Sequence, residues 1–302
     1  MADGEMEART ESRARGRDGP PPEAGGPIMY APPAPESARY LEHDGEQLYV
    51  VVHPPSSPLV ARVLLCGPFG LERDFSYTTW VRWARYLAGE GFEVLHFDYR
   101  GIGESSGRLE RLGTEAWLAD TRLALRFLHR RTGPAPVLVH GLRFGALLAS
   151  RVFAEGEADG LLLWDAPSSA RDVLLDVLRR KLAEDFVNGA TKRRSRESFI
   201  AELERGGHVE VEGYLWGQRL WEESASLPLA LPAPEDARPW LVVHLDRRGE
   251  RRVDARDHAL VLPIPRPPFW GADPFLLTDL QDVFSASTGF LREAARTGRE
   301  AA

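Results

Sequence analysis

The sequence has few of the features that mark exported, disulfide-bonded or membrane proteins. Its 302 residues contain a single cysteine, Cys66, which excludes an intramolecular disulfide and fits a reducing compartment. No run approaches the roughly 20 apolar residues that a membrane-spanning helix needs, so no transmembrane segment is expected. The first 26 residues are charged and rich in glycine and proline, without the apolar stretch of an export signal. These absences predict a cytoplasmic protein.

The charge balance argues against nucleic acid as the main partner. The chain carries 38 basic and 45 acidic residues, a formal net charge of −7, whereas phosphate backbones attract basic surfaces. Lys192-Arg193-Arg194 is the only notable basic run, and we interpret it as the solvated face of a helical segment. We expect a small-molecule partner, no cofactor and no metal ion. The sequence does not set the oligomeric state.

Composition and periodicity divide the chain into four parts. Residues 1–37 have almost no large apolar side chains, so they cannot offset their ordering entropy and are predicted to be a disordered tail. Residues 38–165 and 237–299 alternate short β-rich runs with helical patterns and form the predicted core. Residues 166–236 are first helical and charged, then mixed, and are predicted to be an insertion.

The order of predicted elements indicates a doubly covered parallel sheet. Repeated strand–helix–strand units need right-handed crossovers and place helices on both faces of the sheet. An insertion at 166–236 is expected to form a small cap over the carboxyl edge, where open α/β sheets bind ligands. The predicted strands are a hairpin of 40–41 with 47–52, then 61–66, 92–97, 136–140, 161–164, 209–214, 240–244 and 258–262; the predicted helices cover about 80–87, 114–131, 146–153, 171–186 and 273–296.

One short motif indicates which α/β fold this is. Gly141-Leu142-Arg143-Phe144-Gly145 follows a predicted strand and precedes a run of small residues. Small residues two before and two after a central position let a strand turn sharply into a helix, which is the nucleophile elbow of α/β hydrolases. The sequence therefore predicts an α/β-hydrolase fold. Arginine stands where that fold carries its catalytic serine.

Two loops support this interpretation. Asp98-Tyr99-Arg100-Gly101-Ile102-Gly103-Glu104-Ser105 resembles a tight turn common in α/β hydrolases, so Ser105 and Ser106 are read as structural hydroxyls. The loop that begins at Cys66-Gly67-Pro68-Phe69 occupies the place of the oxyanion loop. There the backbone N–H groups of Phe69 and Phe144 are predicted to converge on a developing negative charge. Cys66 itself is expected to be an inert buried thiol.

Serine-type catalysis in this fold needs a nucleophile, an acid and a histidine, in that order. Arg143 is always protonated and cannot attack a carbonyl. Asp246 and Asp165 are the candidates for the acid. The loop after the last predicted strand contains no histidine, and His258 lies at the wrong end of that strand. Since losing the nucleophile alone costs on the order of 10⁶ in turnover, ordinary esterase or peptidase activity is not expected.

A cation at a helix N-terminus opposes the helix dipole, so Arg143 needs anionic partners. The acids best placed by topology are Asp246, Asp165 and Glu72. One interpretation is an internal salt bridge that fills a dead site. The other is a ligand anchor, in which Arg143 and the elbow N–H groups hold a carboxylate, a phosphate or an acidic sugar.

The same motifs resemble a bacterial branch of the α/β hydrolases, the second type of exosortase-A-system-associated hydrolase. The resemblance runs from about Arg62 to Leu291, and it implies an elbow arginine throughout the branch, a hydrolase ancestry and a link to exopolysaccharide export and protein sorting. The chain departs from the branch where Gly67 replaces the first residue of its His-Pro-Phe loop. The matching stretches are Gly67-Pro68-Phe69, residues 141–149, residues 210–214 and Pro268-Phe269-Trp270.

Three functions stay open on the sequence. The first is a degenerate hydrolase, a pseudoenzyme that binds a small anionic or acyl ligand in a capped cleft through Arg143, Phe144, Phe69 and Glu72. The second is an active hydrolase of ester or amide bonds that works without serine, through water activated by Asp246 or Asp165. The third is a non-enzymatic interaction protein that uses its cap and charged tail.

Overall fold

A computed structural model describes residues 35–187, 194–246, 252–254, 258–264, 268–271 and 279–301. The predicted disordered tail falls outside this part of the chain up to residue 34. The strand predicted around Tyr40 lies within the described part, and in the structure it begins earlier, at Ser37.

Nine strands of the described residues form one sheet, and two more form a separate small sheet. In chain order the strands are β1 (Ser37–His43), β2 (Glu46–His53), β3 (Ala61–Cys66), β4 (Phe92–Phe97), β5 (Val137–Leu142), β6 (Gly160–Trp164), β7 (Val209–Val211), β8 (Tyr214–Trp216), β9 (Trp240–Asp246), β10 (Arg252–Asp254) and β11 (Ala259–Pro263). The large sheet has the order β1-β2-β4-β3-β5-β6-β9-β11-β10, and β7 pairs with β8.

Seven α-helices and two short 3₁₀ turns accompany these strands in the described residues. They are α1 (Leu71–Gly89), η1 (Leu109–Arg111), α2 (Thr114–His129), α3 (Phe144–Ala154), α4 (Ala170–Val187), α5 (Arg196–Glu204), α6 (Gln218–Glu223), η2 (Ser224–Ser226) and α7 (Gln281–Ala301).

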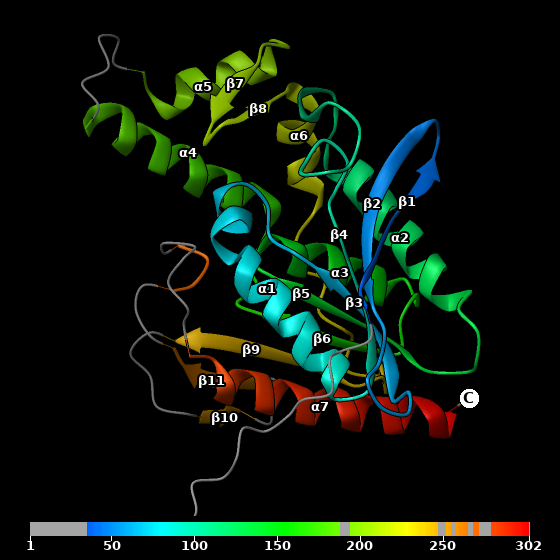
Figure 1. Ribbon diagram of the computed structural model, residues 1–302. Helices are drawn as coiled ribbons and strands as arrows, with labels where there is room; N and C mark the ends of the chain where they lie inside the picture. The colour runs from blue at the N-terminus through cyan, green and yellow to red at the C-terminus, as the bar shows by residue number, and fades with distance from the viewer. Residues whose placement is uncertain are drawn as a thin grey trace, which may run out of the picture. The chain divides into compact units, whose positions relative to one another are not determined.

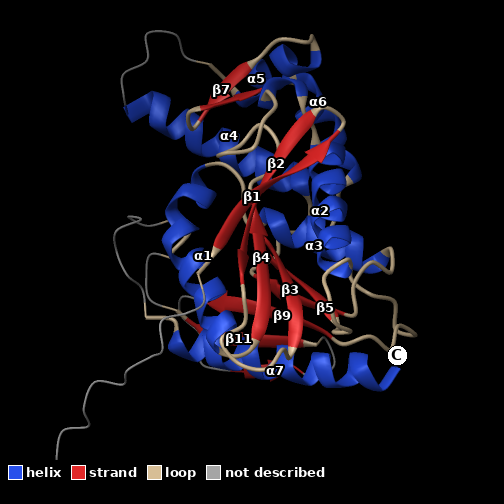
Figure 2. Cartoon of the chain, turned by 45° about the vertical axis from the view of Figure 1, so that its right-hand side comes forward, coloured by secondary structure: helices blue, strands red, loops and turns tan. Residues whose placement is uncertain are grey.

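The centre of the large sheet is parallel, from β4 through β3, β5, β6 and β9 to β11, while β1, β2 and β10 pair antiparallel with their neighbours. Helices cover both faces, as Figures 1 and 2 show. One apolar core contains residues of α1 and α7, such as Trp83 and Leu291, and the other contains residues of α2 and α3, such as Leu125 and Phe153. The predicted fold class is confirmed. The central strands are continuous apolar runs because both of their faces are covered.

The strand register brings the functional loops to one edge. Cys66 at the end of β3 lies opposite Gly141, Leu142 of β5 lies opposite Trp164, and Trp164 of β6 lies opposite Val243. The loops that follow β3, β5, β6 and β9 therefore start side by side at the carboxyl edge of the sheet.

Three local predictions need correction. The single strand expected over 209–214 is a hairpin, since Glu212 and Gly213 take positive φ angles of 53° and 81° and turn the chain between β7 and β8. The last helix begins at Gln281, and residues 279–280 are not helical. Strand β10 was not expected, because three residues carry too little pattern to be recognised.

No helix among the described residues is both long and apolar enough to cross a membrane.

His140 is a buried histidine of the sheet that lies in the apolar core and not at the elbow. His140 of β5 is fully buried, and its Nδ1 lies 2.9 Å from the carbonyl oxygen of Leu162. The rings of Trp80, Trp83 and Trp164 surround it. Burial in this apolar setting lowers the pKa of His140 to about 3.

Because the folded-state pKa of His140 is depressed, unfolding takes up a proton below the ordinary histidine pKa. We expect this group to cost about 1.4 kcal/mol of unfolding free energy per pH unit as the pH falls from 6.5 towards its folded value. His140→Gln retains a donor for the Leu162 carbonyl, and its unfolding free energy should fall less steeply with decreasing pH than that of the wild type. Urea unfolding of both proteins at several pH values between 6.5 and 4.5 measures this, and equal slopes would contradict it.

Candidate functional site

The elbow has the tight geometry that its sequence predicts. Arg143 stands between β5 and α3 with φ 53° and ψ −122°, a conformation that non-glycine residues rarely adopt. A Cβ atom on Gly141 would lie 2.4 Å from the Ala146 Cα, and one on Gly145 would lie 2.1 Å from the Cys66 carbonyl oxygen. Both glycines are therefore required by close backbone approach.

The Arg143 guanidinium binds Glu72, which lies in the first turn of α1. Its Nε and Nη2 donate to the two carboxylate oxygens at 3.2 and 3.1 Å, so the contact is bidentate. Only 20% of the Arg143 side chain and 10% of the Glu72 side chain are exposed to solvent. The pair is thus largely withdrawn from water.

Asp165, the residue after β6, is the second partner of Arg143. Nη1 donates to the Asp165 carbonyl oxygen and to its Oδ2, both at 3.3 Å. Asp165 also has a positive φ, 46°, so two strained residues face each other at this edge. Burial raises the pKa of Asp165, although Arg143 opposes the shift. Burial lowers the pKa of Arg143, but Glu72 and Asp165 outweigh it and the net shift is upward.

An indole stands beside the arginine in the segment where the fold would place its histidine. Trp270 follows β11, and its ring centroid lies 5.8 Å from the Arg143 guanidinium carbon, within cation–π range. In the sequence, Trp270 stands out only through the family resemblance. Its position after the last core strand nevertheless predicts a place at the carboxyl edge of the sheet, near Arg143.

Arg143 also lines a pocket of about 810 Å³. Its apolar wall contains Leu71, Phe75, Pro268 and Trp270. The volume falls within the range of small-molecule sites. Arg143 is therefore both ion-paired and accessible from a cavity.

The basic side chains that line the pocket all have acidic partners. Its basic lining residues are Arg143, Arg180 and Lys181, and its acidic ones are Glu72, Glu184, Glu210 and Glu212. Each of the three cations already has a carboxylate partner: Glu72 for Arg143, Glu212 for Arg180, and Asp185 for Lys181. Within the described residues, the pocket offers no unpaired cation to an anionic ligand.

Phe69 and Phe144 lie where the sequence placed them, but as packing residues. Phe69 is 3% exposed and Phe144 is fully buried, and their rings lie 5.5 Å apart. Phe69 also contacts Trp216 of β8 at 5.7 Å between centroids. The side chains thus join the loop after β3 to the β7–β8 hairpin. Convergence of the two backbone N–H groups stays a prediction. Burial raises the pKa of the Cys66 thiol, in agreement with an inert role.

The other candidate acid and the two histidines near the last strands lie at opposite ends of the sheet. Asp246 ends β9 at the carboxyl edge, and its side chain is outside the described part. His258 stacks on Trp240 at the opposite end, with ring centroids 4.4 Å apart. His244 is not among the site residues predicted from the sequence. It directly follows Val243, the partner of Trp164, so it is the cross-strand neighbour of Asp165 and lowers the pKa of that carboxyl.

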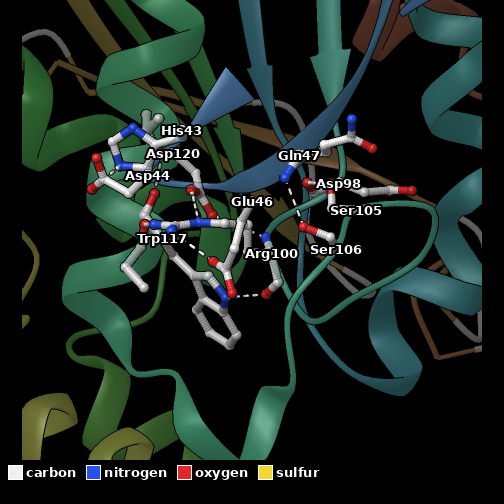
Figure 3. Close-up of polar contacts among 12 residues, drawn as sticks. His43, Asp44, Glu46, Gln47, Asp98, Arg100, Ser105, Ser106, Trp117 and Asp120 are labelled. Carbon is white, nitrogen blue, oxygen red and sulfur yellow. Dashed lines mark hydrogen bonds and ion pairs between the residues drawn. The ribbon is translucent and has the colours of Figure 1, made fainter. Parts of the chain in front are cut away.

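The loop after β4 is a structural brace (Figure 3). Ser105 Oγ accepts the Tyr49 N–H at 2.8 Å, and Ser106 Oγ accepts the Gln47 N–H at 2.6 Å, which ties the loop to β2. Arg100 donates from Nε to the buried Asp120 carboxylate at 2.6 Å. Neither serine hydroxyl lies at the elbow. This agrees with the interpretation of Ser105 and Ser106 as structural hydroxyls.

The described residues contain no cluster of three or more histidine, cysteine, aspartate or glutamate side chains suited to a metal ion.

Sequence comparison matches part of the chain to a hydrolase family. Residues 76–179, about a third of the chain, match the profile of the family described as serine aminopeptidase, S33. The matched stretch includes the elbow. No curated protein matches the sequence.

Solved structures show the same fold at low identity. Est1E from Butyrivibrio proteoclasticus, with ferulic acid bound, is 15% identical with a TM-score of 0.60, covering 85% of this chain and 99% of that one. A hypothetical protein from Pseudomonas aeruginosa is 19% identical with a TM-score of 0.56, covering 87% and 95%. An α/β serine hydrolase without a lid from Xanthomonas campestris is 16% identical with a TM-score of 0.51, covering 87% and 97%. The protein is an α/β-hydrolase-fold protein.

Two substitutions of Arg143 separate its ion pairs from its backbone strain. Arg143→Ala should lower the unfolding free energy by about 2 kcal/mol, because Glu72 and Asp165 lose their cation. Arg143→Gly loses the same pairs but tolerates a φ of 53°, and should recover about 1 kcal/mol.

Denaturant unfolding at neutral pH checks both values. Arg126→Ala is the control, since Arg126 is exposed on α2 and has no ion pair within the described residues. Equal stabilities of the alanine and glycine variants at position 143 would exclude backbone strain at the elbow.

Proposed function

We propose that this protein is a degenerate α/β hydrolase that binds a small acyl ligand in the pocket beside Arg143. The observation that carries the proposal is that the residue at the nucleophile position is ion-paired and still lines a cavity of about 810 Å³. In this proposal the segment between β6 and β9 is the cap, residues 166–236, and the protein is a pseudoenzyme. Fold similarity alone cannot carry the proposal, since one fold hosts many functions.

The loss of serine catalysis is coordinated across the site. Arginine replaces the nucleophile, and the described part of the loop after β11 brings Trp270 towards the guanidinium. Glu72 and Asp165 hold Arg143 in place. A single damaging substitution would leave the other triad positions intact, whereas here the replacement residues contact one another. This supports a site rebuilt for another use.

The charge balance favours an acyl ligand over an anionic one. A carboxylate would have to displace Glu72 to make a bidentate contact with Arg143, and it would meet an excess of acids on the pocket wall. A neutral carbonyl oxygen needs only one donor. The contacts of Arg143 leave one N–H on Nη2 without an acceptor among the described residues. Trp270 and Phe75 supply an apolar surface for the rest of the ligand.

A second candidate is hydrolysis through activated water. It is favoured by one observation, the raised pKa of Asp165, because a perturbed carboxyl in contact with a pocket residue, here Arg143, is a candidate acid–base group. Asp246 remains part of this candidate. The link to exosortase systems, a bacterial source and a cytoplasmic location belong to the proposal through the sequence resemblance and composition alone.

The degenerate triad is tested with a serine-directed fluorophosphonate probe. We expect no labelling of the wild-type protein, and none above background for Arg143→Ser, because no histidine follows β11 to activate the hydroxyl. A serine hydrolase such as trypsin serves as the positive control. Labelling of the wild type would refute the assignment, and turnover of p-nitrophenyl butyrate that vanishes in Asp165→Asn would favour the second candidate.

Ligand chemistry is tested with two compounds that share one ring. Methyl ferulate is neutral and ferulate is anionic, and ferulic acid is bound in one structural neighbour. We expect methyl ferulate to raise the melting temperature more than ferulate, through linkage to the folded state, and Trp270→Ala to abolish the difference.

A larger shift with ferulate would reverse the choice between acyl and anionic ligands. If neither compound nor aliphatic methyl esters of increasing length change the melting temperature, the acyl-binding proposal fails and the interaction-protein alternative takes its place.

A further inference from the structure

The tip of the β7–β8 hairpin, residues 212–214, lies at the rim of the pocket. Glu212 and Gly213 belong to the pocket lining, together with Leu71 and Phe75 of α1. In Figure 1 the hairpin lies above the end of the large sheet, beside α4 and α6. The tip comes from the segment between β6 and β9, so its contacts with α1 join two distant parts of the sequence across the cavity.

Glu212 makes the strongest of these contacts. Its Oε2 accepts the N–H of Leu71, the first residue of α1, at 3.2 Å, and its Oε1 accepts Nε of Arg180 at 3.1 Å. Only 7% of the Glu212 side chain is exposed, although it stands at a hairpin tip. The neighbouring Glu210 side chain is 61% exposed. The buried carboxylate therefore bridges the helix N-terminus and the cation of α4.

Tyr214 makes the second contact, which is with the same first turn of α1. Its hydroxyl lies 3.3 Å from the Oδ1 atom of Asp74. Glu72, which binds Arg143, lies between Leu71 and Asp74 in that turn. The hairpin tip and the elbow arginine are thus connected through four consecutive residues of α1.

The base and the tip of the hairpin differ in their freedom to move. Val209 and Trp216, which pair at the base, are almost completely buried. A Cβ atom on Gly217 would lie 1.9 Å from the Glu110 carbonyl oxygen, so the chain is tightly packed there. At the tip, by contrast, a Cβ on Gly213 would meet nothing within 4 Å. Glu212 itself has a φ of 53°, a strained conformation that its two hydrogen bonds hold in place.

We propose that this tip is a gate over the pocket and that the Glu212 carboxylate is its latch. When the bonds to Leu71 and Arg180 break, the strained turn relaxes, Tyr214 leaves Asp74, and the pocket opens beside Phe75. The buried base keeps the rest of the hairpin in place. The inference rests on the proposed function only in assigning a ligand to the opening; the gate itself is a property of the free protein.

The chain offers a clean chemical probe of the gate. Its only cysteine, Cys66, is fully buried, so a cysteine introduced by Phe75→Cys is the reactive thiol of the pocket. Alkylation by the neutral reagent iodoacetamide, measured by mass spectrometry, reports access to that thiol. Glu212→Ala in this background should raise the alkylation rate on the order of tenfold, as expected from the loss of hydrogen bonds to a charged group.

Glu184→Ala is the matched control, because Glu184 lines the same pocket and has no ion pair or hydrogen bond within the described residues. It should change the rate less than twofold. Equal acceleration by both variants would show that pocket charge, and not the latch, controls access, and would overturn the proposal. So would an unchanged rate in Glu212→Ala.

Hydrogen exchange without the introduced cysteine gives an independent reading. Glu212→Ala should increase exchange in residues 212–214 and in the first turn of α1, with no change in β5 or α3. Increased exchange throughout the sheet would mean general destabilisation and would contradict a local gate. No ligand enters either experiment, so a working gate with no methyl ester binding would disprove the proposed function alone.

Discussion

The ion pairs of Arg143 are the constraint on which the rest of the site depends. A guanidinium at the start of α3 opposes the helix dipole and lies where only a fifth of its side chain reaches solvent. It is stable there because Glu72 in the first turn of α1 and Asp165 directly after β6 both bind it. Parallel strands end at the same edge, so the fold that creates the strained elbow also supplies the carboxylates that satisfy it.

The same ion pairs determine the charge that the pocket presents. In the proposed function, the ion-paired Arg143 does not select anions, and the apolar surface of Trp270 and Phe75 is the more important feature of the wall. The first turn of α1 serves both sides of the cavity: Glu72 holds the arginine, and the N–H of Leu71 holds Glu212. The proposed gate and the proposed ligand site are therefore connected through one short piece of helix.

Much of the fold was predictable because it repeats strong local patterns. Strands β3 and β4 were predicted with their observed bounds, since both are unbroken apolar runs between turn residues. The elbow was recognisable because Gly141 and Gly145 are required by backbone contacts only a few residues away. The β7–β8 hairpin was misread as one strand, because Glu212 takes the positive φ angle that a turn signal would assign to glycine or asparagine.

By itself, the sequence determined the fold class, the elbow and the absence of a serine nucleophile and of a later histidine, because these depend on residue identity and short-range spacing. Tertiary structure decided which acids hold Arg143, that Trp270 lies beside it, and that Glu212 closes on α1. These contacts join residues between 22 and 141 positions apart. The predicted topology limited the acids near Arg143 to three candidates, but it could not choose among them. Only the register of the sheet and the packing of the hairpin bring them together.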